Sequence, residues 1–308
     1  MSPKPLPAAF VQAMPALFVF LWSTGFIGAV WGLPYAGPMT FLAVRFLLTL
    51  VLLLPLALLT GTRWPGRRGL IASAVTGLLM HAGYLGGCFV AMAHGLPAAI
   101  TALIVCLQPL LTATLVGPLL GERVTRLQVA GLVLGLGGVG LVLSERLVAA
   151  GAGLLAGFDL PAIGGAVLAL LAMSGGLVFQ KRHGGGVDLW AGAFIQYAAA
   201  AAVLLPLAMV FEGMAVEVTG GFVFALVWLI LALSIGAISL LMLLIRAGEA
   251  GRVASYFYLV PPVTALIAWP LFGDRLSWLQ VAGMAVAVVG VALVTAWDGR
   301  AARRAAAA

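Results

Sequence analysis

The sequence predicts an all-α integral membrane protein of ten transmembrane helices, arranged as two five-helix repeats of inverted topology. Three observations support this fold class. Of the 308 residues, 64% are hydrophobic and 8% are charged, whereas soluble domains have about 25% charged residues. Residues 102–143 align without a gap to residues 254–295, with 18 of 42 positions identical, so the chain contains an internal repeat. The basic residues between the apolar segments fall almost entirely on one side of the predicted membrane.

Ten apolar segments follow one another along the chain, and each is long enough to cross a bilayer as a helix of about 20 residues. Gly, Pro and charged residues mark the ends of these segments. The connections between them are short, so the chain has no room for a soluble domain. The predicted spans are residues 12–32, 39–59, 70–91, 97–119, 127–144, 161–180, 189–211, 221–245, 253–272 and 278–297.

The repeat extends over nearly the whole chain. The last two spans of each copy align at an offset of 152, and earlier segments align at 151, where LLPLA at 53–57 recurs at 204–208. Because each copy has an odd number of spans, the second copy starts on the opposite side of the membrane and is inverted. The predicted organisation is a first five-helix repeat at 1–146, an external linker at 147–160, and a second repeat at 161–308 that ends in a short basic cytoplasmic tail.

The charge distribution predicts the orientation. With the amino terminus in the cytoplasm, 13 basic residues lie on the cytoplasmic side and two, Arg146 and Arg275, lie outside. The positive-inside rule therefore predicts a multi-pass protein of the cell (inner) membrane with both termini in the cytoplasm. The turn GER at 121–123 falls inside and its copy GDR at 273–275 falls outside, as inversion requires. The first apolar stretch is too long for the core of a signal peptide, so we interpret it as a retained span.

Several classes of function are disfavoured. The cytoplasmic loops account for the net charge of +7, so no nucleic-acid partner is expected. His81, His94 and His183 are far apart in the sequence, and no metal-ligand cluster or nucleophile and base pair is visible. We therefore expect no metal, no cofactor and no enzymatic activity. Cys88 and Cys106 lie in apolar segments and are expected to be buried thiols. The expected partners are a small-molecule substrate and the lipid bilayer, and the sequence is compatible with a monomer.

A set of short motifs is distributed over both copies. They are Trp22-Ser23 in the first span, Pro38 with Arg45-Phe46 in the second, Pro109 and Glu122-Arg123 in the fourth span and its turn, and Tyr256, Pro261 and Asp274-Arg275 in the second copy. Together with the two inverted repeats, these motifs resemble the drug/metabolite transporter superfamily, specifically its EamA-type exporters. The resemblance covers both halves of the chain. One departure is Met173, which stands where many relatives carry a tryptophan.

The resemblance implies a secondary transporter that works by alternating access, with a central cavity between helices 1–4 and 6–9 and with helices 5 and 10 as an outer scaffold. Members of the family move small organic solutes, mostly outward, and the best understood relatives export aromatic amino acids. We therefore expect export of aromatic or neutral amino acids. Drugs or nucleosides as cargo, and a lipid translocase of the same fold, are the alternatives. Nucleotide sugars as cargo would require several intramembrane cations for the phosphates, and the predicted spans contain Arg45 alone. Antiport through a carboxylate would require an Asp or Glu inside a span, and the predicted spans contain none. Both are therefore disfavoured.

Arg45 is the one basic residue inside a predicted span, seven residues after Pro38. A charged side chain at such a depth costs about 2.5–3.5 kcal/mol or more, so it must face protein or a cavity. Arg45 is a candidate partner for a substrate carboxylate; alternatively, it caps carbonyls of a neighbouring helix or extends to the interface. The second copy has Gln196-Tyr197 at the equivalent point, which makes Gln196 a further candidate.

Polar residues in the third and fourth spans recur at helical spacing, so each set shares one helix face. His81 is either a hydrogen-bonded packing residue or a group that binds substrate or a proton. The fourth-span set either joins helices by hydrogen bonds or lines the site. Pro109 and Pro261 occupy equivalent positions and predict a pair of broken helices that act as hinges. The two sets are Gly77, His81, Tyr84 and Cys88, and Thr101, Val105, Gln108 and Thr112.

Four aromatic residues, Trp22, Tyr84, Tyr256 and Tyr258, lie within spans and not at the interfaces where Trp and Tyr usually collect. They either pack against lipid and protein or form a pocket that stacks on a planar or apolar solute. The complete set of predicted substrate-binding residues is Trp22, Arg45, His81, Tyr84, Thr101, Gln108, Gln196, Tyr256 and Tyr258.

Overall fold

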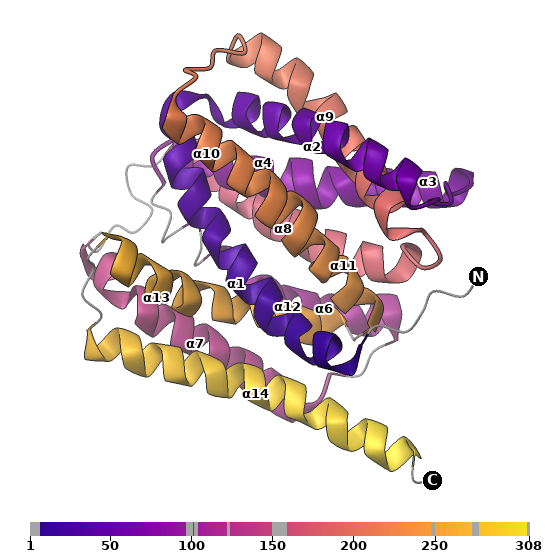
Figure 1. Cartoon of the computed structure of the whole chain (residues 1–308). Coiled ribbons are helices and arrows are strands. Elements are labelled where there is room, and N and C mark those ends of the chain that lie inside the picture. Colours follow the sequence, from indigo (N-terminus) through magenta and orange to yellow (C-terminus); the bar gives the residue numbers. More distant parts are fainter. Residues whose placement is uncertain are drawn as a thin grey trace.

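A computed structural model describes residues 7–96, 101, 104–121, 124–149, 159–247, 250–272 and 277–306. These residues form a bundle of long helices (Figure 1), and their only strand-like pairing is a single bridge between Ala36 and Val216. Nine of the ten predicted spans are helical over their described residues, and the fourth is interrupted by a turn at residues 106 and 107. The helix ends agree with the predicted ends to within a few residues, apart from the carboxyl ends of the fifth and tenth spans, which extend further, and the start of the fourth span, which lies outside the described residues. The prediction of an all-α membrane protein is confirmed.

The helices of the first repeat are α1 (Ala8–Gly32), α2 (Pro38–Leu59), α3 (Arg67–Gly77), η2 (Leu78–Gly83), α4 (Tyr84–Ala93), α6 (Gln108–Leu120) and α7 (Arg126–Ala149), with a short turn η1 (Leu33–Tyr35) after α1. Those of the second are α8 (Leu160–His183), α9 (Leu189–Phe211), α10 (Gly220–Trp228), η3 (Leu229–Ala237), α11 (Ile238–Ala247), α12 (Ala250–Ser255), η4 (Tyr256–Leu259), α13 (Val260–Phe272) and α14 (Trp278–Ala306). Where a helix continues through an η segment, the whole forms one span.

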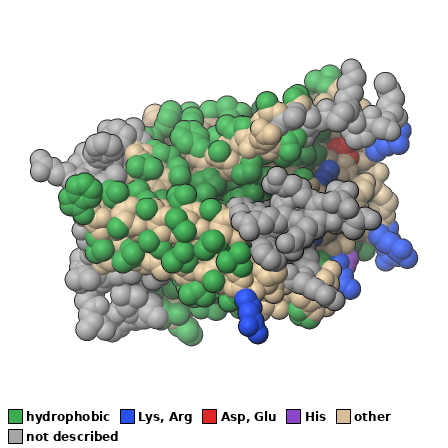
Figure 2. Space-filling view, turned by 90° about the horizontal axis from the view of Figure 1, so that it is seen from below, with side chains coloured by type: hydrophobic (Ala, Val, Ile, Leu, Met, Phe, Trp, Pro, Cys, Tyr) green, Lys and Arg blue, Asp and Glu red, His purple; other side chains and the backbone are tan. Residues whose placement is uncertain are grey.

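Five of these spans are long and apolar enough to cross a membrane within the described residues. They are Pro38–Leu59, Arg67–Ala93, Leu160–His183, Leu189–Phe211 and Gly220–Ala247. The other five contain shorter apolar helices. Many large hydrophobic side chains on the outside of the bundle are exposed, and Figure 2 shows hydrophobic side chains over much of the described part of the visible face. A lipid-facing surface of this kind is expected when hydrocarbon replaces water around the helices.

The packing follows the two-fold relation between the repeats. α2 packs against α9, and α7 against α14, so these spans contact their own counterparts in the other copy. The contact between α4 and α8 is matched by the equivalent contact between α1 and the span of α10 and η3. The two copies are therefore interleaved and do not form separate domains.

α7 and α14 lie side by side along one edge of the bundle (Figure 1). Glycines allow their backbones to approach closely, as small residues do in other membrane helix pairs. A Cβ atom on Gly138 would lie 2.4 Å from the backbone nitrogen of Ala287 and 2.7 Å from the carbonyl oxygen of Gly283. The related pair, Gly131 and Gly290, is equally close. The glycine run at 135–140 therefore serves helix packing at positions 135 and 138.

Both repeats depart from regular α-helix at equivalent places. The π-helical segments η2 and η3 begin at Leu78 and Leu229, which differ by the repeat offset of 151. In the fourth span a turn at residues 106 and 107 precedes Pro109, and in the ninth span the 3₁₀ segment η4 precedes Pro261. Proline lacks a backbone N–H and is tolerated in the first turn of a helix, and each of these prolines is the second residue of a new helical segment, α6 or α13. The predicted pair of broken helices is therefore present at these two prolines.

The two ends of the bundle differ in charge. Among the described side chains, every Lys and Arg except Arg45 lies at the end where α1 begins and α14 ends, and we name this the basic end; these residues are Arg63, Arg67, Arg68, Arg126, Lys181, Arg182 and Arg246. The blue side chains in Figure 2 gather mainly toward that end. The opposite end, the acidic end, carries Asp159, Glu212 and Glu217 among the described side chains. This distribution is the one that the positive-inside rule predicts for a cytoplasmic basic end.

Hydrogen bonds join the two repeats at the acidic end. The backbone amides of Met39 and Thr40 donate to the carboxylate of Glu212 at 3.0 and 2.7 Å, which caps the start of α2 with a residue from the end of α9. Nδ1 of His94 lies 2.8 Å from the carboxylate of Asp159. This hydrogen bond, together with the bond from the amide of Ala162, holds the pKa of the Asp159 carboxyl below its usual value. The repeated turns Glu122-Arg123 and Asp274-Arg275, and residues 150–158 of the predicted linker, lie outside the described residues.

Candidate functional site

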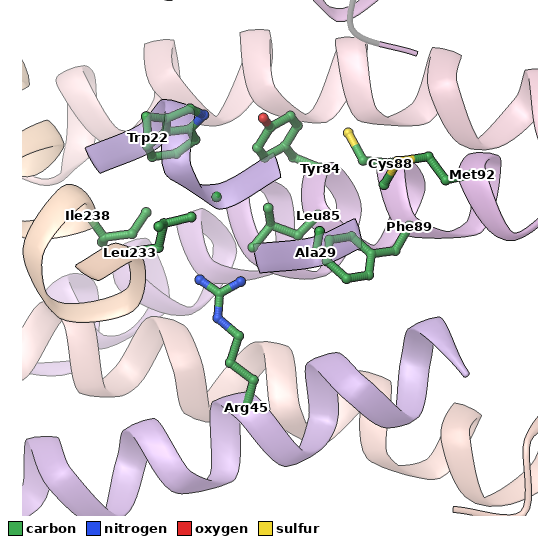
Figure 3. A pocket seen from close by; sticks show the side chains of 11 residues that line it. Trp22, Ala29, Arg45, Tyr84, Leu85, Cys88, Phe89, Met92, Leu233 and Ile238 are labelled. Atoms are coloured by element: carbon green, nitrogen blue, oxygen red, sulfur yellow. The ribbon is translucent and has the colours of Figure 1, made fainter. Parts of the chain in front are cut away.

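A pocket lies in the middle of the bundle, between the first three spans of the first repeat and the span of η3 and α11 from the second (Figure 3). It extends toward the acidic end, because its outermost residues, Ala29 and Met92, lie near the ends of α1 and α4. The free space is narrow and suits a few water molecules, so a larger solute must widen it on binding. Its lining residues are Trp22, Gly25, Ala29, Arg45, Tyr84, Leu85, Cys88, Phe89, Met92, Leu233 and Ile238.

Arg45 is the charged residue of this pocket. Its side chain is 2% exposed, and its Nε donates a hydrogen bond of 3.0 Å to Oγ of Ser234. The guanidinium points into the pocket, near Leu233 and Leu85 (Figure 3). Its two terminal amino groups make no hydrogen bond with any described residue, and no described carboxylate forms an ion pair with it. Arg45 is thus a buried cation with two donor groups directed into the pocket, and the alternative of a carbonyl cap does not apply to the described residues.

Aromatic rings form the wall opposite Arg45. The rings of Trp22 and Tyr84 are stacked, with centroids 6.2 Å apart and an interplanar angle of 22°. Phe18 and Phe257 surround Trp22, each with a ring centroid 5.2 Å from the indole. Trp22 and Tyr84 therefore come together from two spans, as the sequence led us to expect. Such a surface favours flat or apolar groups through ring stacking and burial.

A second cluster closes the pocket toward the basic end. The rings of His81 and Tyr197 stack with centroids 4.4 Å apart and an interplanar angle of 10°. Phe46 packs against both rings. His81 belongs to η2 and lies one helical turn below Tyr84, so this stack lies between the pocket and the basic end.

Polar atoms of this second cluster are buried without partners. Both ring nitrogens of His81 and Oε1 of Gln196 lack a hydrogen-bond partner among the described residues. Gln196 is held by a weak bond from Nε2 to Sδ of Met242 and by the close contact of its backbone with Gly77. A Cβ atom at Gly77 would lie 2.2 Å from the carbonyl oxygen of Gln196. His81 packs through its ring against Tyr197 and Phe46, and both interpretations of His81, packing and binding of substrate or a proton, stay open.

Of the predicted substrate-binding residues, Trp22, Arg45 and Tyr84 line the pocket. His81 and Gln196 lie in the second cluster next to it, and the remaining four lie further away. Gln108 is buried and donates to the hydroxyl of Thr112 at 2.8 Å, and Thr101 is buried with a hydroxyl that has no partner among the described residues. Tyr256 is half-buried between the main core and the α7 side of the bundle. Tyr258 is fully buried in a separate cluster, where its ring contacts the backbone side of Gly135 in α7. It lies between the ninth span and α7, and its buried hydroxyl has no hydrogen-bond partner among the described residues.

A surface hollow at the acidic end approaches the same pocket. It is lined by residues 33–38 after α1, residues 92–96 after α4, and residues 215–217 before α10. Met92 lines both the hollow and the pocket. The pocket is therefore closer to the surface at the acidic end than at the basic end, where the stack of His81 and Tyr197 intervenes.

Several residues at the site were not singled out from the sequence, and Ser234, Phe18 and Phe257 are the ones that contact predicted residues most directly. Ser234 contacts both Arg45 and Tyr197, and Phe18 and Phe257 complete the aromatic wall. Ser234 could have been found by the argument applied to Arg45, because it is one of few polar residues in the eighth span. Phe18 and Phe257 carry no signal that separates them from the other apolar residues of their spans.

Comparison with known proteins assigns the chain to a family. Residues 12–144 and 160–296 each match the EamA-like transporter family, and together these two stretches cover most of the chain. The chain belongs to the EamA-like transporter family. The boundary between the two matches falls at the break between the inverted repeats. The chain is therefore a multi-pass membrane transporter, and the family resemblance drawn from the motifs is confirmed.

Relatives of this EamA-like transporter match over nearly their full lengths. The chain is 32% identical over 287 residues to the uncharacterized inner membrane transporter YedA of Escherichia coli strain K12, an alignment that covers 92% of this chain and 89% of the relative. It is 28% identical over 294 residues to the uncharacterized transporter YvbV of Bacillus subtilis strain 168, with 94% and 93% covered. A crystal structure that shares 23% identity superposes with a TM-score of 0.76 over 96% of this chain and 99% of that one, which shows the same fold.

Proposed function

We propose that this EamA-like transporter exports amino acids with aromatic or neutral side chains by alternating access through the central pocket. One observation carries the proposal: the two terminal amino groups of Arg45 face the pocket without a hydrogen bond to any described residue. A buried guanidinium is stabilised when a carboxylate pairs with it in the bidentate geometry that suits both groups. A solute carboxylate would supply this partner.

The apolar and aromatic lining supports the rest of the solute assignment. Trp22, Tyr84, Phe89 and Leu233 enclose the space beyond the guanidinium, so a solute anchored there by its carboxylate would place its side chain against rings and methyl groups. Stacking and burial then favour an aromatic or apolar side chain. The name of YedA, an inner membrane transporter, supports the same location for this chain, and the charge of the basic end supports cytoplasmic termini.

Transport by purified protein in proteoliposomes tests the proposal. Liposomes loaded with unlabelled L-phenylalanine should accumulate labelled L-phenylalanine, and unlabelled neutral or aromatic L-amino acids outside should compete with it. The corresponding amino-acid amides, which lack the carboxylate, should compete poorly. Equal competition by acids and amides would contradict the proposal, and movement of fluorescent phospholipid without movement of amino acids would favour a lipid translocase.

Replacement of Trp22 by alanine tests the aromatic wall. The change removes the ring that stacks on Tyr84 and contacts Phe18 and Phe257, so the KM for L-phenylalanine should rise about tenfold, in line with one stacking contact. The KM for L-alanine should change much less. Trp278→Ala is the matched control, because Trp278 is 89% exposed on α14 and should leave both values unchanged. An equal rise for both amino acids would remove Trp22 from the solute site.

A further inference from the structure

Ser234 makes two hydrogen bonds in the middle of the bundle. Its hydroxyl accepts from Nε of Arg45 at 3.0 Å, and its backbone carbonyl accepts from the hydroxyl of Tyr197 at 2.9 Å. Its side chain is 1% exposed. It lies in η3, and π-helical segments of this kind often occur at functional sites. One residue therefore joins α2 and α9 to the eighth span.

The bond to Nε fixes the orientation of the guanidinium. An arginine side chain has several rotatable bonds, and a hydrogen bond at Nε defines the plane in which its two terminal amino groups lie. With Nε bound to Ser234, both terminal groups point into the pocket (Figure 3). The edge formed by these two groups is the one that pairs with a carboxylate through parallel hydrogen bonds.

No other described group could fix this orientation by hydrogen bonding. Among the described residues, Oγ of Ser234 is the single acceptor for the guanidinium. Phe46 contacts Arg45 through its ring, with the guanidinium carbon 5.9 Å from the ring centroid, and Thr49 bonds to the backbone carbonyl of Arg45. Neither contact defines the rotation of the guanidinium plane.

The pair of Arg45 and Ser234 is not repeated at the two equivalent positions of the other copies. The position equivalent to Ser234 is Gly83, where a Cβ atom would lie 2.8 Å from the Cβ of Ala172. The position equivalent to Arg45 is Gln196. The cation comes from the first copy and its acceptor from the second, so the pair forms only when the two copies come together.

We propose that Ser234 is a positioning residue that holds Arg45 in the orientation needed to recognise a carboxylate, and so contributes to the preference of this transporter for carboxylate-bearing solutes. The inference rests on the proposed function of the pocket. It adds a residue that acts through Arg45 and does not itself contact the solute.

A pair of probes that differ only in charge tests the inference. Changes in tryptophan fluorescence of the purified protein give the dissociation constants of 3-phenylpropanoate and of the uncharged 3-phenylpropanamide, and their ratio measures carboxylate preference. Ser234→Ala should lower this preference about tenfold, as expected for loss of one hydrogen bond to a charged group, through weaker binding of the acid alone. Ser234→Thr, which keeps the hydroxyl, should restore it.

Two further variants make the outcomes distinct. Ser174→Ala is the matched control, because Ser174 is also a buried serine of the second repeat but bonds only to the carbonyl of Leu170 in its own helix; it should leave the preference unchanged. If the wild type and Arg45→Gln have the same ratio of dissociation constants for the amide and the acid, the proposed function fails. If Arg45→Gln removes the preference while Ser234→Ala keeps the wild-type value, only the inference on Ser234 is overturned. Equal weakening of acid and amide by Ser234→Ala would also overturn it, since that result indicates general disruption of the pocket.

Discussion

Replacement of Arg45 by glutamine is expected to lower kcat/KM for transport of L-phenylalanine by about 100-fold, because the solute carboxylate loses a bidentate, charge-assisted pair in a site from which water is largely excluded. The guanidinium has no carboxylate partner among the described residues. Its removal therefore leaves no buried anion unpaired, and the thermal stability of the protein should stay unchanged or increase. Transport is expected to fall while stability does not, so the experiment separates solute binding from folding.

Uptake of labelled L-phenylalanine into proteoliposomes and thermal unfolding in detergent provide the two measurements. Arg45→Lys should lie between wild type and Arg45→Gln, because lysine keeps the charge but lacks the planar fork. Arg246→Gln is the control: Arg246 donates to the carbonyl of Val187 at the basic end, away from the pocket, and its loss should leave kcat/KM for L-phenylalanine unchanged. If Arg45→Gln lowers folded yield and transport in equal proportion, Arg45 serves packing and the proposed role in solute binding is wrong.

Replacement of Gly138 by alanine is expected to give the largest loss of stability among single changes in the scaffold. The new Cβ would lie 2.4 Å from the backbone nitrogen of Ala287, and backbone atoms cannot move aside as a flexible side chain can. α7 and α14 must separate along their contact, which costs about 2 kcal/mol. Thermal unfolding in detergent should show a clear decrease in midpoint.

The neighbouring glycine is a matched control for this change. Gly137 has nothing within 4 Å of the position of a Cβ atom, so Gly137→Ala should be neutral, or stabilising by up to about 1 kcal/mol because alanine favours helix over glycine. The pocket lies away from α7 and α14, so kcat/KM per folded molecule should stay near the wild-type value in both variants. A similar midpoint for the two variants would show that the helices do not pack through Gly138.

The span pattern was predictable because it depends on composition that is summed over about 20 residues. The repeat at 102–143 and 254–295 also predicted the paired breaks before Pro109 and Pro261, since equivalent residues adopt equivalent backbone conformations. The π-helical segments at Leu78 and Leu229 were not predicted. Their sequences, LLMHAG and LILALSIGA, contain no proline and no Lys, Arg, Asp or Glu, so they offer no local signal for a change of helix type.

The sequence allowed us to predict those site residues whose polar or charged side chains are energetically unfavourable inside a membrane. Arg45, His81 and Gln196 stand out for this reason, and the structure places all three in the centre of the bundle. Aromatic residues gave a weaker signal, because Trp22 and Tyr258 are both buried within spans and only Trp22 lines the pocket. Which ring faces the pocket depends on how the helices are rotated about their axes, and that rotation is set by packing between distant segments.

The difference between Arg45 and its counterpart Gln196 has a kinetic consequence. If the two copies were chemically identical, the bundle seen from one aqueous compartment would be the same as the bundle seen from the other, and a solute would load at equal rates from both. A single fixed cation, present in one copy only, removes this equivalence. For the proposed carrier, we therefore expect KM and the maximal rate to differ between the two sides of the membrane, while the ratio of maximal rate to KM, and hence the equilibrium distribution of an uncharged solute, is the same from both sides.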